Sequence, residues 1–88
     1  KKFPNNSNLL LEYSILKKNL NQTEGALKLL FQFKSNYSKN IKGRELIIEI
    51  LYENQKFLQA EKEISELIEI KRNDQEYIKK LKKKYKLN

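Results

Sequence analysis

The sequence predicts an all-α fold of five helices, and three observations support this prediction. Apolar residues recur at intervals of three and four positions in five segments, which is the periodicity of an amphipathic helix. A sustained alternation of apolar and polar residues, which would indicate strands, occurs nowhere. The chain has only two glycines and one proline, too few to supply the turns of a many-stranded sheet. Its 88 residues suit one domain with a modest core.

The first two predicted helices follow the Phe3-Pro4 dipeptide and an Asn/Ser cluster that can cap a helix. The first has an apolar face at helical spacing, made of Leu9, Leu10, Tyr13, Leu16 and Leu20. A polar break over residues 19–23 follows, and Thr23 is a plausible N-cap for the next helix. The apolar residues of that second helix are Ala26, Leu27, Leu30, Phe33 and Tyr37.

Three further helices are predicted after the break at residues 38–40. The third carries Leu46, Ile47, Ile50 and Leu51 and ends at Asn54. A short strand is the alternative for this Ile-rich run, but Glu49 interrupts it and its neighbours keep helical spacing. The fourth helix spans about 56–70, with one face made of Ala60, Ile64, Leu67 and Ile68. Asn73-Asp74 provides a break and an N-cap for the fifth helix, whose apolar residues are Tyr77, Ile78, Leu81 and Tyr85.

The chain repeats itself at an offset of 34 residues. Ala26 aligns with Ala60, and two further apolar pairs keep this offset, namely Leu30 with Ile64 and Phe33 with Leu67. The same offset aligns one apolar residue from each of three predicted helices, namely Tyr13, Ile47 and Leu81, which we call a column. A second column, Leu10, Arg44 and Ile78, has Arg44 as its one poor member. Such a period indicates stacked helix pairs, each of which buries its apolar face against its neighbours.

The period and pattern resemble the tetratricopeptide repeat, a helix–turn–helix unit of 34 residues. Residues 41–74 match best, because Ala60 supplies the small side chain that lets two helices approach closely. Residues 7–40 match through Ser14, Ala26 and Leu30. The resemblance implies an N-terminal arm at 1–6, unit one at 7–40, unit two at 41–74 and a capping helix at 75–88. Together they would form one short α-solenoid of antiparallel helix pairs.

In this family the first helices of successive pairs line a groove that binds partners. The positions that the resemblance assigns to the groove are Asn8, Leu11, Ile15, Lys18, Asn19, Lys42, Glu45, Glu49, Tyr52, Glu53, Glu76, Lys79, Lys83 and Lys86. Family members that grip a chaperone's C-terminal carboxylate have Lys and Asn where this chain has Leu11 and Ile15, so that activity is not expected. Apolar anchors beside Tyr52 suit a partner's amphipathic helix or extended peptide. The alternative is that Leu11 and Ile15 are buried.

The net charge of +8 is segregated along the chain. Residues 1–44 carry +7, residues 45–70 carry −5 and residues 71–88 carry +6. The last segment could contact phosphates of nucleic acid or anionic lipid through Lys79, Lys80, Lys82, Lys83, Lys84 and Lys86. Against this function, arginine is rare and no nucleic-acid-binding motif occurs. A solvated capping helix is the alternative interpretation of the same residues.

Catalysis has little support, because Cys and His are both absent. Four glutamates are expected on the exposed face of the fourth helix rather than in a cleft, namely Glu61, Glu63, Glu66 and Glu69. We therefore expect no enzyme activity, no cofactor, no metal and no small-molecule substrate. No apolar run reaches the roughly 20 residues that cross a bilayer. The start at Lys1 and the absence of Met lead us to expect a soluble piece of a longer protein, with a processed form as the alternative. The abundance of Lys, Asn and Ile is typical of an AT-rich genome, for which a bacterial source is one candidate.

Overall fold

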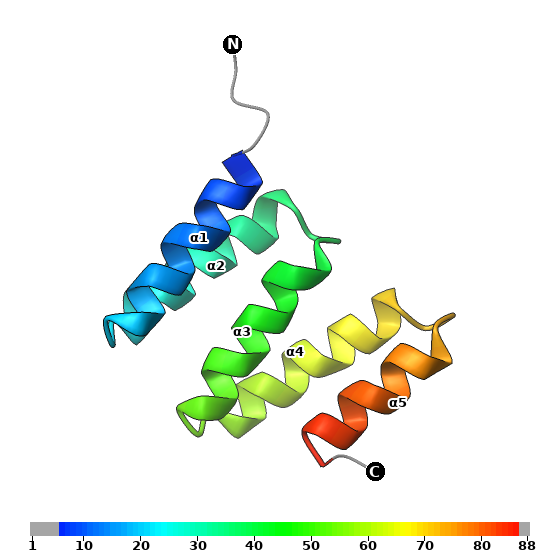
Figure 1. Cartoon of the computed structure of the whole chain (residues 1–88). Helices are drawn as coiled ribbons and strands as arrows, with labels where there is room; N and C mark the ends of the chain where they lie inside the picture. Colours follow the sequence, from blue (N-terminus) through cyan, green and yellow to red (C-terminus); the bar gives the residue numbers. More distant parts are fainter. Residues whose placement is uncertain (1–5, 87–88) are drawn as a thin grey trace.

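The computed structural model describes residues 6–86, and their side chains from residue 11 onward. This part of the chain forms five helices, which confirms the predicted all-α class (Figure 1). They are α1 (Asn6–Asn19), α2 (Thr23–Asn36), α3 (Ile41–Glu53), α4 (Phe57–Ile70) and α5 (Gln75–Lys84). The predicted N-terminal arm and the side chains of Asn8, Leu9 and Leu10 lie outside the described residues.

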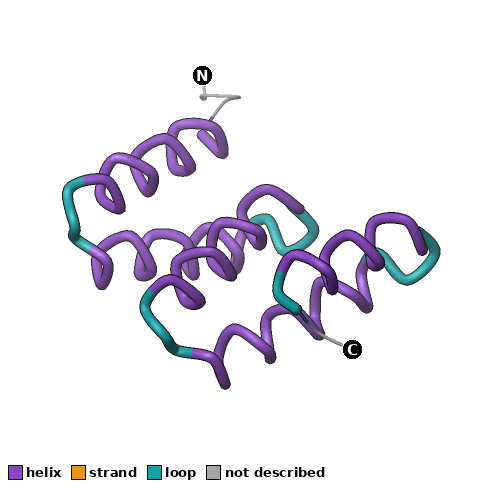
Figure 2. Tube along the Cα trace, turned by 60° about the horizontal axis from the view of Figure 1, so that its bottom comes forward, coloured by secondary structure: helices purple, strands orange, loops and turns teal. Residues whose placement is uncertain are grey.

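Consecutive helices run in opposite directions and are joined by short loops (Figures 1 and 2). The helix α1 packs against α2, α2 packs against α3, and α3 packs against α4. As a result α1, α3 and α5 point the same way, while α2 and α4 point the opposite way (Figure 1). The two hairpins therefore lie in series, with α5 at the far end from α1.

Polar side chains cap the starts of α3 and α5. The side chain of Asn40 accepts a hydrogen bond from the Gly43 N–H at 2.9 Å, and Asp74 accepts one from the Tyr77 N–H at 3.1 Å. These bonds satisfy backbone donors that the first helical turn leaves free. The predicted cap at Asp74 is thus confirmed. The predicted cap at Thr23 is wrong, because α2 begins at Thr23 itself and Gln22 precedes it without a capping side-chain bond.

The loop inside each hairpin contains one residue in the left-handed region. Asn21 follows α1 with a φ of 62°, and Gln55 follows α3 with a φ of 61°. These two residues are 34 positions apart, as are the starts of α2 and α4 and the starts of α3 and α5. The backbone therefore keeps the 34-residue spacing that the side-chain pattern shows.

The core consists of two clusters. The first joins the two hairpins and contains Leu11, Ala26, Leu27, Leu30, Phe33, Ile47, Ile50, Leu51 and Ala60. The second joins α5 to the second hairpin and contains Ile48, Ile64, Leu67, Leu81 and Tyr85. Ile78 is also buried, so the apolar residues of α5 are packed as predicted. Ala60 is fully buried in the first cluster, also as predicted.

The predicted core face of α1 is wrong. Tyr13, Leu16 and Leu20 are 53%, 51% and 58% exposed, whereas Leu11 and Ser14 are buried. The helix has two apolar stripes on opposite sides, since Leu11 and Ile15 are also apolar. Only the stripe with Leu11 meets α2 and α3, and no other described helix covers the stripe with Tyr13. Helical periodicity alone could not show which stripe is buried.

Gly43 of α3 lies directly against the Phe33 ring of α2. A methyl group added there would lie 2.6 Å from the Phe33 ring carbon Cε1, and that ring is fully buried. A Cβ atom is not tolerated at such a distance, so the packing of α3 on α2 depends on this glycine. A methyl group at Gly25 would instead meet the flexible Lys17 side chain at 3.2 Å.

A network of two buried and two half-buried charges ties α2, α3 and α4 together. Lys34 Nζ lies 3.0 Å from Glu63 Oε1 and 3.2 Å from Glu66 Oε1, and Arg44 Nη1 lies 2.9 Å from the same Glu66 oxygen. Glu63 is only 5% exposed and Arg44 is buried as well. The expectation that Glu63 is exposed is therefore wrong, since Lys34 of another helix supplies the counter-charge that permits its burial. Arg44, which interrupts the apolar column of Leu10 and Ile78, is buried because Glu66 supplies its counter-charge.

Candidate functional site

The predicted groove residues of α3 form one exposed strip. Successive residues of this strip are separated by four, three and one positions, which places them on one side of the helix. They are Glu45, Glu49, Tyr52 and Glu53. Glu45 and Glu53 are exposed, and Glu49 and Tyr52 are half-buried. The strip lies on the side of α3 opposite to the core residue Ile47, so the packing of the hairpins leaves it accessible.

The helix α1 borders this strip on one side. Lys18 Nζ lies 3.8 Å from Glu49 Oε2 and 3.6 Å from Glu53 Oε1. All three side chains are a quarter or more exposed, so these ion pairs are weak and screened by water. Ile15 is half-buried, and Asn19 is exposed at the end of α1. The structure thus brings Lys18 together with the strip.

Leu11 does not belong to the accessible surface. It is 6% exposed and packs in the first core cluster with residues of α2 and α3. Its assignment as a groove anchor is therefore wrong, and the alternative of burial is confirmed for this residue. Lys42, the first predicted groove residue of α3, is exposed at the start of that helix, far along it from Tyr52.

The helix α5 borders the strip on the other side and encloses a hollow with α3. The hollow has a volume of about 190 Å³ and is lined by Glu45, Ile48, Tyr77, Lys80, Leu81, Lys84 and Tyr85. The Tyr77 hydroxyl donates a hydrogen bond to Glu45, and the Tyr52 and Tyr85 rings lie 4.8 Å apart between their centroids. The floor is apolar and aromatic, while lysine and glutamate side chains form the rim. Its volume is below the roughly 300–1,000 Å³ of small-molecule sites, so it suits a single inserted side chain better than a small ligand.

The glutamates of α3 lie close enough to the two tyrosines of this hollow to affect their pKa values. Burial, followed by the negative charges of Glu49, Glu45 and Glu53, raises the pKa of Tyr85 to about 12. Burial also raises the pKa of Tyr77, followed by its hydrogen bond to Glu45. Both hydroxyls therefore stay protonated at neutral pH, and that of Tyr77 donates its hydrogen bond to Glu45.

The sequence prediction missed Tyr77 and Tyr85 as parts of this surface. Tyr85 was assigned to packing, and Tyr77 was named only among the apolar residues of its helix. Tyr85 is buried as predicted, and both residues also line the hollow. The signal available was two aromatic residues on a helix otherwise made of lysines, beside the Glu-rich α3. Glu76 is exposed at the start of α5 and does not line the hollow.

The predicted basic patch is exposed. Lys79, Lys80, Lys83, Lys84 and Lys86 all lie on the accessible side of α5 or just after it. None of them makes an ion pair within residues 6–86. Lys80 and Lys84 belong to the rim of the hollow, so the patch and the groove adjoin.

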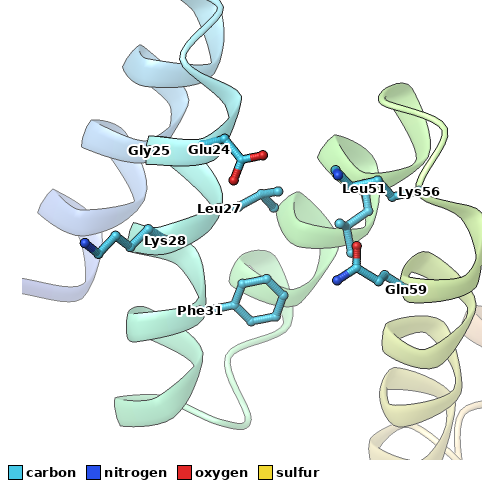
Figure 3. Close-up of a pocket in the computed structure, with 8 residues that line it drawn as sticks. All are labelled: Glu24, Gly25, Leu27, Lys28, Phe31, Leu51, Lys56 and Gln59. Carbon is cyan, nitrogen blue, oxygen red and sulfur yellow. The ribbon is translucent and has the colours of Figure 1, made fainter.

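A second hollow, of about 510 Å³, lies between α2 and the second hairpin (Figure 3). Leu27 and Phe31 point into it from α2, and Leu51 and Gln59 face them from α3 and α4. Glu24, Gly25, Lys28 and Lys56 complete its lining. This hollow was not predicted from the sequence, because its walls come from three helices.

Comparison with protein-family models, curated protein sequences and solved structures gave no match for this chain. Its function is therefore inferred from its own residues and their geometry. None of the helices in the described part of the chain is both long enough and apolar enough to cross a membrane.

Proposed function

We propose that the chain is a non-catalytic protein-interaction module that binds a peptide or amphipathic helix of a partner on the face shared by α1, α3 and α5. The observation that carries the proposal is the hollow between α3 and α5, where Tyr77 and Tyr85 stand beside Glu45. It suits an apolar anchor of the partner, and the neighbouring Glu49 and Glu53 suit a basic residue next to that anchor.

The 34-residue spacing supports a tetratricopeptide-like arrangement of this face. The parallel course of α1, α3 and α5, together with contacts from Lys18 and Tyr77 to the glutamates of α3, is what that arrangement implies for first helices of successive pairs (Figure 1). The groove of the proposal consists of Ile15, Lys18, Glu45, Glu49, Tyr52 and Glu53, with Tyr77 and Tyr85. Leu11 is not among its contacts.

A capture experiment with matched charge reversals tests the proposal. The variant Glu49→Lys/Glu53→Lys changes the groove, and Glu24→Lys/Glu69→Lys makes the same change in net charge at exposed positions of α2 and α4. Both should keep the helical circular dichroism signal, because none of the four residues is buried. Proteins captured from native cell extract by the wild type should be lost with the groove variant and retained with the control. An unchanged set of captured proteins with the groove variant would refute the groove assignment.

A second candidate function follows from the exposed lysines of α5. Five lysines without ion-pair partners in the described part of the chain could contact the phosphates of nucleic acid or of an anionic lipid surface. Insertion of α5 into a membrane is not part of this candidate, because Ile78, Leu81 and Tyr85 are used for packing.

Titration against a single-stranded polynucleotide and against phosphatidylserine vesicles over a salt series tests this second candidate. Contact with several phosphates requires an affinity that falls steeply as salt rises, and Lys79→Gln/Lys83→Gln/Lys86→Gln should reduce the slope. Absence of binding to both probes at low salt would eliminate it.

A further inference from the structure

Three aromatic side chains meet where α3 ends, where α4 begins and just after α5. The Tyr52 ring is common to both contacts, since its centroid lies 5.0 Å from that of Phe57 and 4.8 Å from that of Tyr85. The planes of these two rings are inclined to that of Tyr52 by 71° and 59°. Because the three rings are not stacked in parallel, they can form the walls of a site.

The rings line a cavity together with residues of α4. Its volume is about 280 Å³, and it is lined by Tyr52, Phe57, Glu61, Ile64, Tyr85 and Lys86. It shares only Tyr85 with the hollow between α3 and α5. Ile64 and Tyr85 are buried, whereas Phe57 is 48% exposed, so one wall of the cavity is in contact with water. A cavity of this volume suits a group of a few atoms rather than a drug-sized ligand.

The packing of the helix pairs does not require these rings. At the offset of 34 residues, Tyr52 corresponds to Lys18 and Phe57 corresponds to Thr23. The first hairpin therefore forms with a charged and a polar residue at the equivalent positions. Two aromatic rings at this end are a property of the second hairpin alone, which points to a ligand rather than to hairpin packing.

The cavity contains a carboxylate that can accompany a cation. Its lining carries one carboxylate, Glu61, and one ammonium group, Lys86. Neither makes an ion pair within residues 6–86, so the Glu61 carboxylate is available to a bound cation. Glu49 and Glu53 of α3 add negative charge near Tyr85, because both contribute to the raised pKa of that residue.

The chemistry of the rings selects a particular kind of cation. An ammonium group already lies over one of them, since Lys84 Nζ is 5.5 Å from the centroid of the Tyr85 ring. The faces of aromatic rings attract cations, and quaternary ammonium groups are bound by sets of such rings. A lysine ammonium is strongly hydrated, whereas a trimethylammonium group presents methyl groups and loses less hydration on entering an apolar site. Three rings with a single carboxylate therefore favour the methylated group.

We propose that the cavity of Tyr52, Phe57 and Tyr85 binds a trimethylammonium group and that Glu61 supplies its counter-charge. A choline-type small molecule and a trimethylated lysine side chain both present this group. Tyr52 and Tyr85 also belong to the groove described above. The proposal nevertheless goes beyond the proposed function, because it requires no partner protein and is unaffected if the capture experiment fails.

The probe is choline, titrated at constant ionic strength into the full 88-residue chain labelled with ¹⁵N. Saturable amide shift changes should concentrate at positions 52–61 and 83–86. The uncharged isostere of choline, with carbon in place of nitrogen, should bind at least about tenfold more weakly, because the attraction between cation and rings is lost. Acetyl-trimethyllysine amide then identifies the source of the group. Tighter binding than choline indicates a protein side chain, and weaker binding indicates a small molecule.

Matched variants test the named residues. Phe57→Leu removes one ring but keeps an apolar side chain, and it should weaken choline binding roughly threefold to thirtyfold. The control Tyr13→Leu removes a ring that is 53% exposed on α1 and should leave the affinity unchanged. Glu61→Gln should weaken binding about threefold, while Glu69→Gln, at another exposed position of α4, should not. Lys86→Gln should strengthen binding, because it removes a like charge from the lining.

The proposal is overturned if choline does not bind, if the uncharged isostere binds as tightly, or if the shift changes concentrate elsewhere in the chain. It is also overturned if Phe57→Leu weakens binding no more than Tyr13→Leu. Circular dichroism should show that all variants are as helical as the wild type. If Phe57→Leu loses helical signal, Glu61→Gln and Glu69→Gln decide the question, because both glutamates are exposed. Selective weakening by Glu61→Gln supports the proposal, and equal affinities of these two variants refute it.

Discussion

The two ends of the molecule, α1 and α5, differ in what they expose. The helix α5 buries Ile78 and Leu81 and exposes lysines on its outer side. The helix α1 buries Leu11 on its inner side and exposes Tyr13 and Leu16 on its outer side. A row of helices always has two ends, and polar residues must cover the outer side of a terminal helix if it faces water. The outer side of α5 meets this requirement, whereas the outer side of α1 exposes the apolar side chains of Tyr13, Leu16 and Leu20.

The largest expected effect on stability comes from deleting α5, the helix whose outer side is polar. Deletion of residues 75–88 exposes the second core cluster around Ile48, Ile64 and Leu67. The loss of three packed side chains costs about 1.5–3 kcal/mol for each, which is comparable with the whole stability of a small domain. We expect the shortened chain to aggregate or unfold, as measured by circular dichroism and gel filtration.

Replacement of the six lysines between positions 79 and 86 by Gln is the control for this deletion. It keeps the packed residues Ile78, Leu81 and Tyr85, so the thermal midpoint should change little. A cooperatively folded chain without residues 75–88 would show that α5 is an appendage rather than part of the core.

The next effect concerns the contact between the hairpins. Gly43→Ala should destabilise the fold by about 1–3 kcal/mol in urea unfolding, because the added methyl group meets the buried Phe33 ring. Alanine is favoured over glycine in a helix by about 1 kcal/mol, which reduces this loss. Gly25→Ala, at the start of α2, should be neutral or stabilising, because only the flexible Lys17 chain must move. Equal effects of the two changes would contradict the close approach at Gly43.

A smaller effect is expected at the loops within the hairpins. Gln55→Gly should stabilise the fold by about 0.5–1 kcal/mol, because a residue with a side chain is strained at a φ of 61°. Asn21→Gly should raise the stability by less than Gln55→Gly, since asparagine tolerates the left-handed region better than glutamine does. Urea unfolding of both variants measures the difference. A loss of stability in Gln55→Gly would show that this residue is not left-handed in solution.

The smallest effect is electrostatic. Hydrogen bonding to Arg44, followed by the contact with Lys34, lowers the pKa of Glu66 below its ordinary value of 4.5 despite partial burial. A lowered folded-state pKa stabilises the fold above pH 4.5, and the stabilisation is lost as the pH falls through the lowered value. Because Glu66 is partly exposed, the contribution is about 1 kcal/mol or less. Between pH 6 and pH 3, Glu66→Gln should therefore lose less stability than the wild type, and an equal loss would contradict this role.

The comparison of α1 with α5 also explains what could be predicted from the sequence. All five helices were predicted, because polar breaks such as Asn73-Asp74 separate strongly periodic segments. The buried side of α5 was predicted correctly, because the lysines of this helix leave only one apolar stripe. The prediction of the buried side of α1 was wrong, because this helix has two apolar stripes. Which of them is buried depends on where α2 and α3 lie.

The candidate site was predicted in part for the same reason. The strip on α3, with Glu45, Glu49 and Tyr52, lies on the accessible side as predicted, because a helix with one broad apolar face leaves no other orientation. Leu11 was wrongly predicted to line the groove, because the buried side of α1 was not identified from the sequence. The burial of Glu63 was not predictable from its own helix, because the partner Lys34 comes from a hairpin distant in sequence.

The central claim is that α1 presents its Tyr13 side to water while the equivalent side of α3 is covered. Relaxation of leucine methyl protons by a soluble paramagnetic agent tests it most directly in the unmodified chain. The account predicts strong relaxation for Leu16 and Leu20 and protection for Leu30 and Leu81. Protection of Leu16 and Leu20 equal to that of Leu30 would contradict it.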